Sequence, residues 1–279
     1  MVARKRSRLP AHIMSRSFLL TLATLMLSGC NIQNSFLYFP DSSRPGHEFL
    51  KRNSISPWPS SGEYRGLVSR DGPKQAIGTV IVFHGNAGTA ADRIFYVKAL
   101  GAVGYRAILA EYPAYGGRKG ALGEKSFVGD GVETVRLAVR EFGGPLFLLG
   151  ESLGCGVAAA VARETSDTIA AIILITPWDT LASVARAKFP YLPVRLLLAD
   201  TYDTIGNLSS FTGRIAVVGA GRDEIIPIQH ANDLYASLPG TAKKMWTIPE
   251  AGHNDWPAFT DASWWNQIMG FASGRDNGQ

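Results

Sequence analysis

The stretch at residues 150–154, Gly-Glu-Ser-Leu-Gly, decides the fold, because it separates an apolar run from a run of small residues. Residues 145–149 (Pro-Leu-Phe-Leu-Leu) predict a buried strand, and residues 155–162 predict a helix packed closely on a parallel sheet. A serine between two glycines at such a junction is typical of a nucleophile elbow, a strained turn that bulky neighbours would obstruct. The sequence therefore makes Ser152 the candidate nucleophile.

A serine hydroxyl is a weak nucleophile at neutral pH, so it needs a base and an acid that orients the base. The apolar run at residues 214–221 predicts a strand, and Asp223 follows it directly. The run at residues 244–249 predicts the last strand, and His253 lies in the loop after it. We expect His253 to be the general base and Asp223 to be the acid that orients it.

Other residues compete for these two roles. Glu224 is adjacent to Asp223, and Asp200 and Asp203 precede it, so each is either a surface charge or a replacement acid. Asp255 is interpreted as a loop carboxylate or a helix cap. The remaining histidines are expected to be structural or exposed: His12, His47, His84 and His230.

The developing oxyanion requires hydrogen-bond donors, which backbone N–H groups supply in sites of this kind. Leu153, directly after the nucleophile, provides the first predicted donor. Residues 79–83 predict a β-branched apolar strand that leads into a glycine-containing turn at residues 84–88 (His-Gly-Asn-Ala-Gly). We expect the N–H of Asn86, in that turn, to be the second donor.

Together these motifs resemble the α/β-hydrolase family and, more narrowly, its small serine-hydrolase branch that includes protein depalmitoylases. The resemblance covers the chain after its leader and includes the family's chain order of Ser, Asp and His. It implies an α/β fold with a mostly parallel sheet, and catalysis that uses no cofactor. Residues 111–117 are also similar to a tyrosine- and glycine-rich stretch of that branch, but Pro113-Ala114 stands where Arg-Gly is usual. The branch's substrate is therefore not carried over.

Strand-like and helix-like segments alternate after residue 63, which predicts a parallel sheet covered by helices on both faces. Residues 178–211 interrupt this alternation with an aromatic and apolar insertion, interpreted as a short cap over the pocket that favours acyl or alkyl groups. The alternative is a packed surface helix without substrate contact. The predicted strands are residues 79–83, 105–112, 145–149 and 170–175, and the clearest helices are residues 123–142 and 153–164.

Residues 1–29 predict a secretory signal, with basic residues followed by an apolar run at residues 18–27. That run is about half as long as a bilayer-spanning helix. Residues 27–30 (Leu-Ser-Gly-Cys) resemble a bacterial lipobox, which implies that Cys30 is diacylated and holds the domain on a membrane, facing the periplasm. An ordinary secretory signal, an uncleaved anchor and a start at Met14 remain alternatives. Asn31 slightly favours the outer membrane.

Composition excludes several classes of function. The formal net charge is +5, and residues before Cys30 hold five Arg or Lys and no Asp or Glu, so the mature chain has a net charge of 5 − 5 = 0. Nucleic-acid binding therefore has no compositional basis. Two cysteines and scattered histidines without paired spacing predict no metal site. If Cys30 is lipidated, Cys155 has no disulfide partner and is expected to be a small buried residue.

We expect three segments: a signal peptide at residues 1–29, an approach segment at residues 30–62 that is irregular over residues 41–61, and one hydrolase domain at residues 63–279. The predicted function is cleavage of an ester or thioester, with an amide as a further option, by an envelope-anchored serine hydrolase. The substrate is a small or acylated molecule. The alternatives are a peptidase or lipase of the same fold, and a non-catalytic envelope protein that uses the fold for binding.

Overall fold

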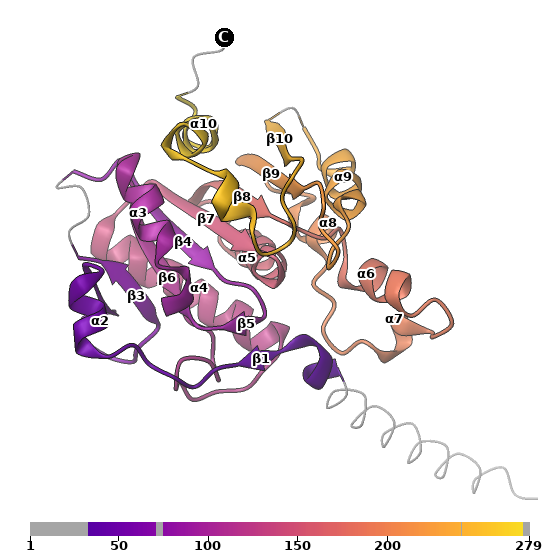
Figure 1. The fold of residues 1–279 in the computed structure, drawn as a ribbon, viewed down its shortest axis with the longest axis horizontal. Helices are drawn as coiled ribbons and strands as arrows, with labels where there is room; N and C mark the ends of the chain where they lie inside the picture. The colour runs from indigo at the N-terminus through magenta and orange to yellow at the C-terminus, as the bar shows by residue number, and fades with distance from the viewer. Residues whose placement is uncertain (1–32, 71–74, 241, 276–279) are drawn as a thin grey trace, which may run out of the picture.

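The computed structural model describes residues 33–70, 75–240 and 242–275. A sheet of eight strands forms its centre, in the order β10-β9-β8-β7-β4-β6-β3-β2 (Figure 1). Only β3 runs opposite to the other strands of this sheet, so the predicted mostly parallel sheet is confirmed. The strands are β2 (Ile55–Trp58), β3 (Gly66–Ser69), β4 (Thr79–Phe83), β6 (Arg106–Ala110), β7 (Leu146–Glu151), β8 (Ile169–Ile175), β9 (Arg214–Ala220) and β10 (Lys243–Ile248).

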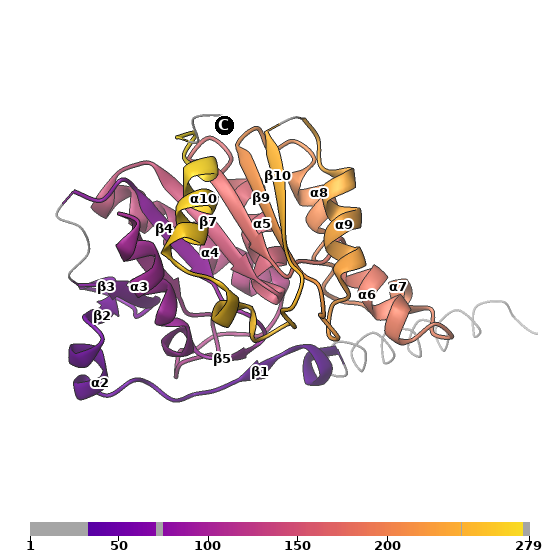
Figure 2. The same cartoon turned by 45° about the horizontal axis from the view of Figure 1, so that its top comes forward.

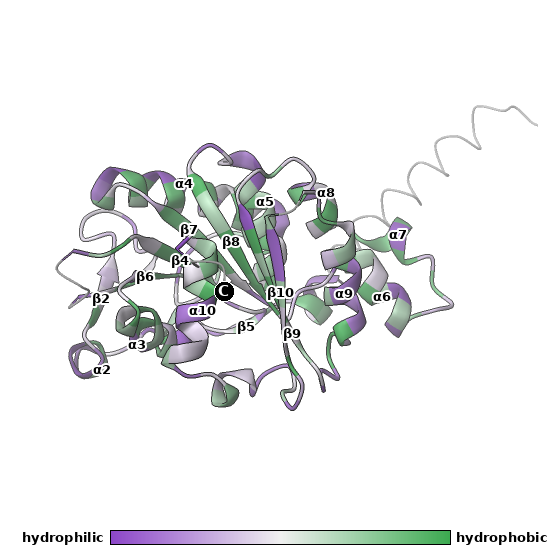
Figure 3. Ribbon diagram, turned by 90° about the horizontal axis from the view of Figure 1, so that it is seen from above, coloured by the Kyte–Doolittle hydropathy of each residue, from purple (hydrophilic) through white to green (hydrophobic). Residues whose placement is uncertain are grey.

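Helices cover both faces of this sheet (Figure 2). The apolar side chains of β4 divide between the two faces, since Ile81 and Phe83 belong to one core cluster and Val80 and Val82 to the other. This burial on both sides explains why the central strands are continuous apolar runs, which appear as hydrophobic ribbons in Figure 3. One face carries α3 (Phe95–Ala102) and α10 (Ala262–Ala272), and the other carries α4 (Glu124–Phe142), α5 (Leu153–Glu164), α8 (Thr204–Leu208) and α9 (Ile228–Ser237).

The expectation that residues 41–61 are irregular is wrong. They contain α2 (His47–Arg52) and β2, which pairs with β3 at the edge of the sheet. Pro57 lies within β2, and an edge strand tolerates proline because one side of it makes no ladder hydrogen bonds. Upstream, β1 (Phe39–Pro40) pairs in parallel with β5 (Ala87–Gly88), close to the carboxyl ends of the parallel strands (Figure 2).

The cap in the insertion between β8 and β9 is shorter than the predicted residues 178–211. It contains α6 (Leu181–Lys188) and α7 (Val194–Leu197), which project from the sheet beside its carboxyl edge (Figure 1). In contrast, α8 packs against α5, with Tyr202 and Leu208 fully buried in the core. We therefore define the cap as residues 181–198, and assign α8 to the layer that covers the sheet.

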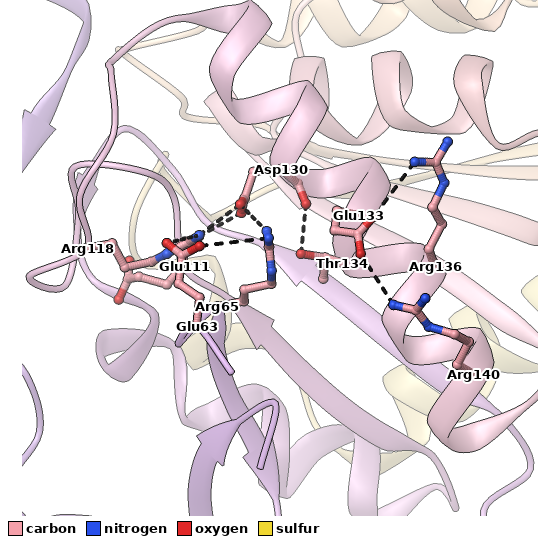
Figure 4. Close-up of polar contacts among 9 residues, drawn as sticks. All are labelled: Glu63, Arg65, Glu111, Arg118, Asp130, Glu133, Thr134, Arg136 and Arg140. Carbon is pink, nitrogen blue, oxygen red and sulfur yellow. Dashed lines mark hydrogen bonds and ion pairs between the residues drawn. The ribbon is translucent and has the colours of Figure 1, made fainter. Parts of the chain in front are cut away.

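A buried ion-pair network fixes the loop after β6 to α4 (Figure 4). The guanidinium of Arg118 donates to both carboxylate oxygens of Asp130, at 2.6 and 2.8 Å, and to the carbonyl oxygen of Glu111 at 2.5 Å. Arg65 contacts the same Asp130 carboxylate. Because removing one partner would leave a buried charge uncompensated, this network specifies the conformation of residues 111–118.

Residues 1–32, with Cys30 and the predicted signal peptide, lie outside the described part of the chain. Within that part, no helix is long and apolar enough to span a bilayer.

Candidate active site

Ser152 lies at the junction of β7 and α5 with φ 55° and ψ −118°, a backbone conformation that is unfavourable for a residue with a side chain. The two flanking glycines are required by space. A Cβ on Gly154 would lie 2.0 Å from the carbonyl oxygen of Phe83, and one on Gly150 would lie 2.4 Å from that of Gly154. The close approach of α5 to the sheet therefore depends on both glycines, and it holds the serine in its strained turn.

The structure brings Ser152, His253 and Asp223 together in one chain of hydrogen bonds. Nε2 of His253 lies 2.8 Å from Oγ of Ser152, and its Nδ1 lies 2.7 Å from Oδ2 of Asp223. All three side chains are buried. This is the arrangement in which an imidazole can take a proton from a serine while a carboxylate fixes its orientation.

The loops after β9 and β10 hold Asp223 and His253 in place. Oδ1 of Asp223 accepts hydrogen bonds from the N–H groups of Ile225 and Ile226, at 2.9 and 2.7 Å, which turns Oδ2 toward His253. The N–H of Gly252 donates to Oδ1 of Asp255 at 2.6 Å, so Asp255 stabilises the loop that carries the histidine.

The competing carboxylates have other roles. Asp203 caps α8 by accepting a hydrogen bond from the N–H of Gly206 at 2.8 Å. Asp200 accepts hydrogen bonds from Tyr38 and from the N–H of Glu124. Glu224 is exposed. Among the carboxylates of the described residues, only that of Asp223 is hydrogen bonded to His253.

Asn86 is held from three sides. Its side-chain Nδ2 donates to the carbonyl of Leu37 at 2.9 Å, and its own carbonyl accepts from the N–H of Phe39 at 2.9 Å and from the hydroxyl of Tyr115 at 2.7 Å. Within the described residues, neither the N–H of Asn86 nor that of Leu153 has a hydrogen-bond acceptor. Both residues line the pocket with Ser152. Their N–H groups are thus available to an oxyanion beside the serine.

A buried pair, His84 and Glu111, lies beside this turn, and only the structural role of His84 was considered from the sequence. His84, expected to be structural or exposed, is buried, and its Nδ1 lies 2.7 Å from the carbonyl oxygen of Gly85. Its Nε2 lies 3.1 Å from Oε1 of Glu111, whose other oxygen accepts from the N–H of Ala90 at 3.1 Å. The role of Glu111 was missed, because only the fold brings the end of β6 beside the turn after β4.

A second, partly buried pair lies next to Ser152. Glu151 accepts hydrogen bonds from Nε of Arg93 and from the hydroxyl of Tyr96, both at 3.0 Å. Burial lowers the pKa of Arg93, but Glu151, Tyr96 and Asp92 together outweigh it, and the pKa of Arg93 is raised. Both members of the pair line the pocket. Their roles were not predicted from the sequence, in which the only signal was an acidic residue before Ser152.

A pocket of about 700 Å³ opens over Ser152. Its walls are mostly apolar. Leu181, Val184 and Val194 of the cap line one side, and Phe36 and Leu37 of the N-terminal segment also line the pocket. Another hollow, of about 890 Å³, lies against α4 and α8, but it has a charged lining and shares no residue with the serine site. The apolar pocket is the candidate substrate site, because it contains the serine and the histidine.

Comparison with known proteins agrees with this architecture. Residues 78–212 match the family model described as alpha/beta hydrolase fold. An esterase from Pyrococcus furiosus superposes with a TM-score of 0.64 at 16% identity, covering 84% of this chain and 96% of the esterase. A monoacylglycerol lipase from Paleococcus ferrophilus superposes with a TM-score of 0.55 at 17% identity, covering 74% and 97%. The chain has the α/β-hydrolase fold.

Sequence relatives are more similar but largely without a described activity. An uncharacterized protein of Mycobacterium tuberculosis is 32% identical over 183 residues, so the match spans 63% of this chain and 63% of that relative. The uncharacterized protein YfhR of Escherichia coli is 27% identical over 236 residues, 81% of each chain. Lysophosphatidylserine lipase ABHD12 of Danio rerio is 25% identical over 175 residues, covering 56% of this chain and 46% of the lipase.

Proposed function

We propose that this protein is a serine hydrolase that cleaves a carboxylic ester or thioester through an acyl-enzyme. The observation that carries the proposal is the continuous hydrogen-bond chain from Ser152 through His253 to Asp223 at the floor of an apolar pocket. A serine at the floor of a pocket rarely has a buried histidine and a buried, twice-bonded carboxylate behind it unless the serine reacts.

In the proposed mechanism, Oγ of Ser152 attacks the acyl carbonyl while Nε2 of His253 takes the serine proton. Asp223 keeps the imidazole in the tautomer that can accept this proton and stabilises the imidazolium. The N–H groups of Asn86 and Leu153 bind the negative oxygen of the tetrahedral intermediate. His253 then gives its proton to the departing alcohol or thiol, and a water molecule, activated by the same histidine, releases the acid.

An acyl compound is the substrate class that this pocket favours. Its apolar walls suit a hydrocarbon chain, and it contains few polar groups other than those beside the serine. The named relatives and structural neighbours include an esterase, a monoacylglycerol lipase and a lysophosphatidylserine lipase, which supports a carboxylic ester substrate. The resemblance to depalmitoylases supports testing thioesters as well. An amide or a peptide is the second candidate and uses the same acyl-enzyme.

We further propose that the protein is a periplasm-facing lipoprotein held in the cell envelope through Cys30. The support is the sequence of residues 16–30, with a basic residue, an apolar run and Leu-Ser-Gly-Cys in succession. Mass spectrometry of the protein purified from membranes tests this directly. A mature N-terminus at a diacylated Cys30 is expected, and an unmodified Cys30 would contradict it.

Labelling with a fluorophosphonate probe tests the proposed nucleophile. The wild-type protein is expected to form one adduct, on Ser152, and Ser152→Ala to form none. Ser183→Ala is the matched control, because Ser183 also lies by an acid and a histidine, Asp179 and His230, but outside the proposed mechanism. Unchanged labelling of folded Ser152→Ala would disprove this nucleophile. A folded wild-type protein that neither reacts nor hydrolyses p-nitrophenyl butyrate would favour the non-catalytic binding protein.

A further inference from the structure

The exposed apolar side chains of the described residues gather around the mouth of the pocket. Ten large apolar residues are exposed in this part of the chain. Six of them line the pocket, and two more, Tyr191 and Leu196, belong to the cap and directly precede two of these six, Leu192 and Leu197, in the chain. Tyr191 is 97% exposed and Leu196 is 79% exposed. A soluble surface seldom concentrates apolar side chains in this way unless another phase or molecule covers them.

The charged side chains of the cap have one sign. Residues 181–199 contain three basic residues and no acidic one. These three, Arg186, Lys188 and Arg195, are exposed, and within the described residues none of them forms an ion pair. Apolar side chains bordered by unpaired cations are complementary to a bilayer that contains anionic lipids, since the cations can meet the headgroups while the apolar groups enter the acyl region.

The chain reaches this face from its N-terminal side. Gln33, the first described residue, receives hydrogen bonds from the N–H groups of Ala199 and Asp200, at 2.6 and 3.2 Å, directly after the cap. Gln33 lies three positions after Cys30 in the chain, and three residues span at most about 11 Å. Acyl chains on Cys30 would therefore lie close to the mouth of the pocket.

We infer that the cap, residues 181–198, together with residues 33–39, forms a face that docks on the lipid bilayer. The mouth of the pocket then opens toward the membrane, so that an acyl substrate enters directly from the lipid phase instead of crossing water. This inference rests on the proposed function for the nature of the substrate, but docking itself depends only on the apolar and basic side chains.

Site-specific fluorescence tests the docking. The full-length protein, purified from membranes and reconstituted into vesicles of phosphatidylethanolamine and phosphatidylglycerol, carries Leu196→Cys labelled with the environment-sensitive fluorophore NBD. Cys155 is fully buried, so the introduced cysteine is the reactive one in the described part of the chain. We expect a blue shift and strong quenching by lipids spin-labelled on their acyl chains. Val139→Cys on α4 is the control, because Val139 is exposed but outside this face, and it should show neither effect.

Absence of quenching at Leu196, with the protein present in the vesicles, would overturn the inference. So would a blue shift that already occurs in detergent solution together with a doubled molecular mass, because a second copy of the chain would then cover the face. Both results are independent of catalysis, so they separate failure of docking from failure of the proposed hydrolase, which fluorophosphonate labelling decides.

A kinetic experiment tests substrate entry. Tyr191 and Leu196 do not line the pocket, so the double variant Tyr191→Ser/Leu196→Ser should hydrolyse a soluble short-chain ester normally. Its activity on a long-chain ester embedded in vesicles should fall roughly tenfold, because two apolar side chains no longer enter the membrane. Val139→Ser should change neither rate. Equal rates for wild type and double variant on embedded ester would contradict entry from the membrane.

Discussion

Oδ2 of Asp223 lies 2.7 Å from Nδ1 of His253, while Oδ1 of the same carboxylate is bound by the N–H groups of Ile225 and Ile226. The loop of Asp223 thus fixes its carboxylate independently of the contact with His253. This relationship distinguishes Asp223 from the other carboxylates of the region, because Asp203 caps a helix and Asp200 lies against Tyr38.

Asp223→Asn should therefore reduce kcat/KM on a p-nitrophenyl ester by about 10⁴-fold, because an amide no longer holds the imidazole in the tautomer that accepts the serine proton. Asp203→Asn should lower activity by less than about threefold, since that side chain only caps α8. Steady-state kinetics of the two purified variants makes this comparison. An equal loss in both would point to a general structural effect.

Asn86→Ala should lower kcat by roughly tenfold with little change in KM, because it removes the hydrogen bond from Asn86 Nδ2 to the carbonyl of Leu37 while leaving the backbone N–H in place. The loss should reflect a less well-positioned oxyanion donor. Tyr115→Phe removes another contact to the same residue and should change kcat in the same direction. A rise in KM alone would instead assign Asn86 to substrate binding.

Gly154→Ala should lower the free energy of unfolding by about 3 kcal/mol or more, because the new Cβ overlaps the backbone carbonyl of Phe83. Gly129→Ala is the matched control. Nothing lies within 4 Å of a Cβ at that position in α4, so alanine should stabilise the protein by about 0.5–1 kcal/mol through helix propensity. Denaturant titration followed by circular dichroism measures both values, and equal effects would contradict the packing argument.

The Cys155 thiol should resist alkylation by iodoacetamide at pH 8 in the folded protein. Burial raises the pKa of this thiol well above its usual value, so the reactive thiolate is scarce, and the side chain is fully enclosed. In linkage terms, the neutral thiol is retained in the folded state. Its contribution to stability is full below the unfolded pKa of about 8.5 and is lost as the pH rises above that value.

Reaction of Cys155 should appear only when denaturant unfolds the chain, and peptide mapping by mass spectrometry locates the modified residue. Fast alkylation of the native protein would show that α5 opens locally, and would contradict tight packing of the helix behind Ser152.

Several features could be predicted from the sequence because they depend on local order along the chain. Apolar runs of β-branched and other large residues that are buried on both sides predicted β4 and β8 within a residue, and α5 was predicted with its observed bounds. The glycines around Ser152 were informative for the same reason, since a helix close behind a strand excludes any Cβ there.

Features that depend on contacts between distant segments could not be predicted. The strand β2 was missed because a proline-containing run has no strand signal by itself, and it is stabilised only by pairing with β3. The extent of the cap was overestimated because only tertiary packing shows that α8 lies against α5.

The sequence by itself determined the alternation of strands and helices after residue 63, the elbow at Ser152 and the residues competent for acid and base roles, because these follow from local periodicity and residue chemistry. Only the tertiary structure decided that Asp223, and not a neighbouring carboxylate, contacts His253, that Glu111 and Glu151 form buried pairs beside the site, and that residues 33–39 line the pocket. Each of these depends on segments far apart in the chain, which burial of a shared apolar core brings into contact.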